Sequence, residues 1–192
     1  YVSDTYNLWD VCTKIVPALK SEILARDGKL VIRPDSGDPV KIICGTVTKQ
    51  YKTIGEAVDD INDAHHTEAR NDCEGSHTVG MDEYTTIAKV GEDYYEFTTP
   101  MSYNRHDKKY YYVENYGKYG VTTHKQIQAT PEMKGVIELL WEVFGGSVTN
   151  KGYKMLDPHI GAIYGDSITI DRVKAISEQL MSKGFAPQLV YG

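Results

Sequence analysis

The sequence predicts an α/β protein in which parallel strands and helices are interrupted by a region of antiparallel strands. Residues 1–45 and 131–192 alternate short apolar strands with amphipathic helices, the order typical of a parallel sheet. Residues 46–130 contain YTTIAKV, YYEFTTP and KKYYYVENYG, where β-branched and aromatic residues are separated by turn formers, as in antiparallel sheets. We therefore expect the two outer segments to fold together, interrupted by an inserted α+β subdomain at residues 46–130.

The first outer segment is predicted to contain a helix and one strand. Apolar residues recur at helical spacing between residues 8 and 24, and Pro17 should break or kink that helix. The apolar run at residues 29–32 is a predicted strand. It ends at the motif RPDSG, residues 33–37.

The later elements follow from the same kinds of pattern. A polar helix is predicted at residues 54–69, before the tyrosine-rich strands. Beyond residue 131, the pattern predicts a helix at 136–144, stopped by Gly145 and Gly146, and a short strand at 160–164. A turn at residues 165–166 precedes a helix at 170–183, with Thr169 as its N-cap, and residues 185–190 are a candidate third strand.

Charge and cysteine content exclude several functions. The chain of 192 residues has a formal net charge of −6 and a pI near 5.5, which argues against bulk electrostatic binding to nucleic acid or to an anionic membrane. No window is apolar enough for a membrane span and the N-terminus lacks the plan of a signal peptide, so we expect a cytoplasmic protein. The three cysteines match no zinc pattern, and Cys12 and Cys44 are expected to fill the core in reduced form.

Two loops at predicted strand ends carry the candidate site, because ligands of parallel α/β proteins gather at the carboxyl edge of the sheet. In the first loop, Arg33 offers a planar fork for a phosphate or an amide carbonyl, and Asp35, with Ser36 beside it, can accept hydrogen bonds from a sugar diol. In the second, Gly165 lets a ligand approach the backbone, and the helix after Asp166 offers its positive end to an anion. The alternatives are an Arg33 to Asp35 pair that merely holds its loop, and an ordinary turn with a helix cap.

Other polar groups are weaker candidates. Asp4 either caps the first helix or contacts the ligand. The group that contains His65, His66 and His77 matches no zinc spacing, so we interpret these histidines as solvated and predict no metal site. The tyrosines of residues 46–130 could stack on bases, but the acidic surroundings favour half-exposed strand faces or an interface.

Three stretches resemble the nicotinamide phosphoribosyltransferase family, in the family's order: SDTYNLWDVCTKI, LVIRPDSGDPV and NKGYKMLDPHIGAIYGDSITIDRVKAISEQLMSKGFAPQLVYG. The resemblance implies part of an irregular α/β barrel of the type II phosphoribosyltransferases. In this sequence the inserted subdomain expected at residues 46–130 interrupts that barrel. It also implies that nicotinamide is joined to phosphoribosyl pyrophosphate, giving nicotinamide mononucleotide and pyrophosphate for NAD biosynthesis. Mg²⁺ accompanies the phosphoribosyl pyrophosphate, an ATP-coupled step is left open, and a homodimer is implied.

The same resemblance implies roles for individual residues. Arg33 lies beside the nicotinamide amide, and Asp35 contacts the ribose. Gly165 and Asp166 hold the phosphate and ribose hydroxyls, and Asp4 lies at the same pocket. The expected catalytic residues are therefore Asp35 and Asp166, and the expected substrate-binding residues are Arg33, Asp4, Ser36 and Gly165.

We expect the chain to be a fragment of a longer enzyme, with little activity by itself. Two other hypotheses remain open at this stage. In one, residues 46–130 form a module for protein interaction or oligomerisation. In the other, the parent enzyme uses nicotinate instead of nicotinamide.

Overall fold

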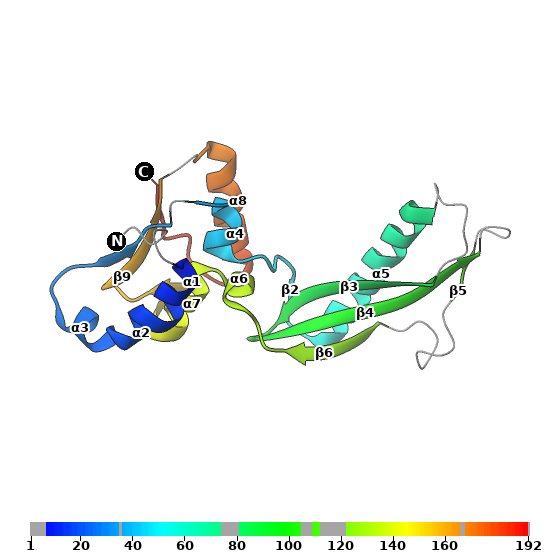
Figure 1. Ribbon diagram of the computed structural model, residues 1–192, viewed down its shortest axis with the longest axis horizontal. Helices are drawn as coiled ribbons and strands as arrows, with labels where there is room; N and C mark the ends of the chain where they lie inside the picture. Colours follow the sequence, from blue (N-terminus) through cyan, green and yellow to red (C-terminus); the bar gives the residue numbers. More distant parts are fainter. Residues whose placement is uncertain are drawn as a thin grey trace. The chain divides into compact units, whose positions relative to one another are not determined.

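The computed structural model describes residues 7–34, 36–73, 81–104, 109–111, 122–165 and 168–191. The chain divides into two compact units: unit 1 comprises residues 1–48 and 129–192, and unit 2 comprises residues 49–128. Unit 1 contains a parallel sheet and unit 2 a largely antiparallel one, so the predicted mixed α/β class is confirmed (Figure 1).

The sheet of unit 1 has three parallel strands in the order β1-β9-β10. They are β1 (Leu30–Ile32), β9 (Ile160–Tyr164) and β10 (Val190–Tyr191). Leu30 pairs with Ile160 and Ile32 with Ala162, while Val190 pairs with Ile163 and Tyr191 with Tyr164. Strand β9 is central and largely buried, as its continuous apolar sequence predicts.

Residues 185–190 form less strand than the pattern predicts. Phe185 makes an isolated bridge to Lys154, at the start of β8 (Lys154–Leu156), which pairs antiparallel with β7 (Gly146–Val148). Regular pairing of β10 begins only at Val190. Pro187 has no N–H to donate to a ladder, which explains the interruption.

The predicted N-terminal helix is divided into short pieces. They are α1 (Leu8–Asp10), the π-helical turn η1 (Val11–Ile15), α2 (Val16–Ala18) and α3 (Lys20–Ala25). Pro17 lies in the first turn of α2, where its missing N–H is tolerated, and the wider turn before it is closed by the Val16 N–H to Val11 carbonyl bond. The prediction of a break around Pro17 is confirmed.

Four further helices complete unit 1: α4 (Pro39–Cys44), α6 (Pro131–Lys134), α7 (Val136–Phe144) and α8 (Ile170–Ser182). The predicted start of α8 is confirmed, because the Thr169 hydroxyl accepts from the Arg172 N–H. Helix α4 packs against α7 and α8, and α7 packs against β9 (Figure 1). The core between them includes Cys12, Ile32, Ile43, Cys44, Leu140, Tyr164 and Ile176.

The ends of α4 and α6 meet back to back. Gly45 and Gly135, at φ +87° and +81°, follow these helices, and a Cβ added to either would overlap the backbone of the other segment. The ammonium of Lys183 lies beside them, donating to the carbonyls of Cys44 at 2.8 Å and Lys134 at 2.7 Å. It also pairs with the Glu138 carboxylate at 2.7 Å, and both side chains are buried.

Unit 2 is a five-stranded sheet with one long helix. Its elements are β2 (Gln50–Tyr51), α5 (Ile54–Cys73), β3 (Met81–Val90), β4 (Asp93–Asn104), β5 (Lys109–Tyr111) and β6 (Thr123–Ile127). Strands β5 and β6 both pair with β4, and β2 pairs parallel with β3. Thr53 and Glu56 cap the start of α5 reciprocally, each side chain accepting from the other's backbone N–H.

The interpretation of His65 as a solvated residue is wrong. His65 is 1% exposed on α5, and its two ring nitrogens lie 2.7 Å from the hydroxyls of Thr99 and Thr86. Thr99 continues this network to Thr122, 2.6 Å away. Because Ala57, Ile61 and His65 are spaced four residues apart, they share the face of α5 that covers the sheet. His77 lies outside the described residues.

Candidate functional site

The two motif loops follow neighbouring strands of the unit 1 sheet. Arg33 comes directly after β1, and Gly165 comes directly after β9. Because β1 and β9 are adjacent and parallel, both loops leave the sheet at its carboxyl edge. Strand β10 is parallel to β9 and reaches the same edge at Tyr191. The fold thus brings together two chain segments that lie on either side of unit 2 in the sequence.

The predicted site residues differ in how much the structure says about them. Arg33 and Ser36 are exposed, and Gly165 is partly buried. Asp4, Asp35 and Asp166 lie outside the described residues. The geometry of the site therefore rests on strands β1 and β9, which precede Asp35 and Asp166 in the sequence, and on the described residues of the two loops.

A hydrogen bond from a buried tyrosine ties one motif loop to the end of β9. The hydroxyl of Tyr164 donates to the carbonyl oxygens of Ser36 and Gly37, at 3.0 and 3.1 Å. Its ring is 1% exposed and belongs to the core of unit 1. Tyr164 is absent from the predicted site. The alternation of Ile160, Ala162 and Tyr164 on one side of the strand indicates a buried position, but nothing in the sequence reveals which carbonyls the hydroxyl meets.

Part of the charge in the RPDSGDP stretch serves the next helix. The carboxylate of Asp38 accepts from the Val40 N–H at 3.0 Å and so caps α4, while Pro39 occupies the first turn. Pro34 is buried, and Gly37 has φ +87°, a conformation that favours glycine. The turn is therefore shaped by its own sequence, and the exposed Arg33 and Ser36 side chains are carried on it.

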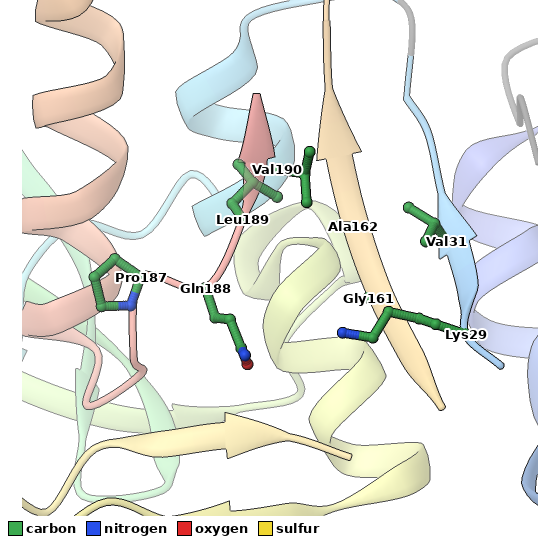
Figure 2. A pocket seen from close by; sticks show the side chains of 8 residues that line it. All are labelled: Lys29, Val31, Gly161, Ala162, Pro187, Gln188, Leu189 and Val190. Atoms are coloured by element: carbon green, nitrogen blue, oxygen red, sulfur yellow. The ribbon is translucent and has the colours of Figure 1, made fainter. Parts of the chain in front are cut away.

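A cavity of about 330 Å³ lies along the sheet below this edge (Figure 2). Successive strand residues alternate between faces, so Val31 faces away from Ile32, which is buried in the core. Gly161 pairs with Val31, and the Lys29 side chain lies across it, with its Cδ 3.2 Å from where a Cβ on Gly161 would be. The lining residues are Lys29, Val31, Gly161, Ala162, Pro187, Gln188, Leu189 and Val190.

The described residues outside the two loops offer little other chemistry. They contain no group of three or more His, Cys, Asp or Glu side chains that could hold a metal ion. Cys12 and Cys44 are buried, as predicted, and burial raises the pKa of each thiol to about 12, so neither forms a nucleophilic thiolate near neutral pH. Among the described helices, none is long and apolar enough to cross a membrane.

Fold and site together define the class: an α/β protein in which two polar loops begin at the carboxyl edge of a parallel sheet. The nicotinate phosphoribosyltransferase (NAPRTase) family model matches residues 2–62 and 79–192, and the chain belongs to that family. This agrees with the family resemblance of the RPDSG and GD motifs.

Several named proteins are similar to the chain. The chain is similar to nicotinamide phosphoribosyltransferases of Acinetobacter baylyi, with 31% identity over 198 residues, and of Mycoplasma pneumoniae, with 28% identity over 192 residues. A Mycoplasma genitalium protein of the same name is 22% identical. Each comparison covers 100% of this chain but only 24%, 26% and 25% of the respective relative. The chain thus spans about a quarter of the length of these relatives.

Proposed function

We propose that this chain is part of a nicotinamide phosphoribosyltransferase, which joins nicotinamide to phosphoribosyl pyrophosphate and releases pyrophosphate in NAD biosynthesis. The observation that carries the proposal is the parallel pairing of β1 with β9, because it places both motif loops at one edge of one sheet. The names of the three relatives support nicotinamide as the base. Unit 1 would then be a portion of the family's α/β barrel, and unit 2 a subdomain inserted into it.

The proposed chemistry depends on positioning and electrostatics. The ring nitrogen of nicotinamide attacks the anomeric carbon of the sugar as pyrophosphate leaves, and the sugar acquires positive character in the transition state. Carboxylates beside the ribose stabilise that charge, and a fixed geometry keeps the two reactants in line. We assign the carboxylate role to Asp35 and Asp166.

The remaining loop residues are assigned to substrate binding. The guanidinium of Arg33 is exposed beyond β1, where it can donate to the amide carbonyl of nicotinamide or to phosphate oxygens. Ser36 contributes a hydroxyl, and Gly165 allows a phosphate to approach the backbone. Asp4 is assigned to the same pocket.

Mg²⁺ is proposed to arrive with phosphoribosyl pyrophosphate, since this ion commonly binds substrate phosphates together with few protein carboxylates. The described residues contain no group of three acidic or histidine donors, so we assign no protein ligand to the ion and derive no step through it. ATP coupling and a homodimeric parent enzyme are further proposals for the full-length protein.

A kinetic experiment on the full-length protein tests the assignment. Nicotinamide mononucleotide formation is measured from nicotinamide and phosphoribosyl pyrophosphate with Mg²⁺, in the wild type and three single variants. We expect Arg33→Ala to raise KM for nicotinamide, and Asp35→Ala or Asp166→Ala to impair use of the ribosyl donor. Ser147→Ala, on the exposed strand β7, is a matched surface control. Unchanged kinetics in all three site variants would remove the site assignment.

Nicotinate is the competing substrate, because the matching family carries the name of the nicotinate enzyme. A guanidinium at Arg33 could pair with the carboxylate of nicotinate as well as with an amide carbonyl. Assaying both bases at equal concentration separates the two activities. A higher kcat/KM for nicotinate would replace the nicotinamide proposal while leaving the phosphoribosyl site intact.

A further inference from the structure

Tyr164 joins two parts of the chain that are far apart in sequence. It is the last residue of β9, and its hydroxyl meets the carbonyl oxygen of Ser36, which lies 128 residues earlier. The carbonyl of Gly37 approaches the same hydroxyl. Since a phenol has one proton, a single donor is shared between two consecutive carbonyls of the motif loop.

The loop between β1 and α4 has a defined anchor at each end. Regular pairing of β1 with β9 reaches Ile32 opposite Ala162, and Asp38 caps α4 at the other end. The Tyr164 hydroxyl contacts the loop between these anchors, at Ser36 and Gly37. Because the Tyr164 ring is held in the core at 1% exposure, its hydroxyl is a fixed reference point for an exposed loop.

We propose that Tyr164 is a positioning residue: its hydroxyl fixes the loop that carries Arg33 and Ser36 relative to the loop that begins at Gly165. Tyr164 and Gly165 are consecutive, so one short segment supplies both the anchor and the second loop. The inference rests on the proposed function, which makes these two loops hold the two halves of the same reaction. Loss of the hydroxyl lets the first loop shift while β9 and the core remain in place, so the loop is less well ordered for binding and nicotinamide binds more weakly.

Tyr191 provides a matched control on the neighbouring strand. It pairs with Tyr164 in the sheet register, and its hydroxyl is also buried. Burial raises the pKa of Tyr191, with a smaller opposing effect from Ser177 of α8, and among the described residues its hydroxyl makes no hydrogen bond. Tyr164→Phe and Tyr191→Phe therefore make the same chemical change on neighbouring strands of one sheet. Of these two hydroxyls, only that of Tyr164 contacts the motif loop in the described structure.

The test compares Tyr164→Phe with Tyr191→Phe in the full-length protein, by steady-state kinetics with nicotinamide, phosphoribosyl pyrophosphate and Mg²⁺. A net hydrogen bond changes an equilibrium by a factor of roughly 2 to 10, so we expect KM for nicotinamide to rise by about this factor in Tyr164→Phe, with kcat changing less. Tyr191→Phe should leave KM unchanged. Both variants should still unfold in one cooperative thermal transition, which separates positioning from a general loss of structure.

An active wild type in which Tyr164→Phe and Tyr191→Phe have the same KM for nicotinamide overturns the positioning role alone. A wild type inactive with both nicotinamide and nicotinate overturns the proposed function and this inference with it.

Discussion

Removing the negative charge of Glu138 is expected to destabilise unit 1 far more than removing that of Glu142. Both glutamates lie on α7, and both pair with a lysine. The Glu138 and Lys183 side chains are 5% and 1% exposed, whereas those of Glu142 and Lys134 are 44% and 23% exposed. The two pairs therefore differ mainly in burial, which decides how much an unpaired charge costs.

The magnitude follows from the contacts of Lys183. In Glu138→Gln its ammonium remains buried beside two carbonyl oxygens, and the carboxylate charge with which it pairs is gone. Breaking one side of a buried ion pair costs about 3–5 kcal/mol, because the remaining charge is kept from water. An exposed pair such as Lys134 with Glu142 contributes about 0–1 kcal/mol. On these ranges, we expect Glu138→Gln to lower the free energy of unfolding by at least about 2 kcal/mol more than Glu142→Gln does.

Urea unfolding of the chain measures this difference. Both tryptophans of the sequence, Trp9 and Trp141, belong to unit 1, so their fluorescence follows the unit that contains the pair. The double variant Glu138→Leu with Lys183→Met should recover part of the lost stability, since no buried charge is left. If the free energies of unfolding of Glu138→Gln and Glu142→Gln agree within about 1 kcal/mol, the reasoning about burial is wrong.

Three further predictions concern other buried groups. Burial, with smaller effects from Lys49 and His66, lowers the pKa of His65 from 6.5 to about 4, so the unfolded chain binds the proton first. The free energy of unfolding should therefore decrease by about 3 kcal/mol as the pH falls from 6.5 to about 4. In His65→Gln this decrease should be missing, as measured by circular-dichroism unfolding curves across that pH range. Gly135→Ala should destabilise unit 1 more than Gly152→Ala. Both glycines have positive φ, but only a Cβ at position 135 would overlap backbone atoms of another segment. The midpoints of urea unfolding of the two variants measure the difference. The thiols of Cys12 and Cys44 should react with a disulfide reagent only when urea opens unit 1, as followed by absorbance.

Local elements of unit 1 are predictable from the sequence where one apolar pattern has clear stop signals. The helix at Val136–Phe144 and the strand at Ile160–Tyr164 have the expected bounds, because glycines end the helix and a continuous apolar run forms the central strand. The third strand is shorter than expected, since Pro187 interrupts the ladder. Pairing is a separate matter, because which strands lie side by side depends on contacts across the whole chain.

Buried polar groups are the part of the structure that the sequence conceals. The residue types of His65, Lys183 and Tyr164 favour a surface or partly exposed position, yet all three are buried and hydrogen-bonded. For His65 the helical spacing from Ala57 and Ile61 contains the signal. The sequence holds no comparable signal for the burial of Lys183, because its carbonyl partners lie at the ends of two helices that only the tertiary fold brings together.

The stretch RPDSGDP at residues 33–39 both starts helix α4 and carries candidate ligand-binding side chains. Helix α4 needs an N-cap and tolerates proline in its first turn, and Asp38 and Pro39 supply both. These two residues would be explained by the fold even without a ligand. Arg33 is not needed for the cap, and the loop is held through the backbone carbonyls of Ser36 and Gly37 rather than through the Ser36 side chain. Substitution of Asp38 should therefore act mainly on stability, whereas substitution of Arg33 should act mainly on substrate binding.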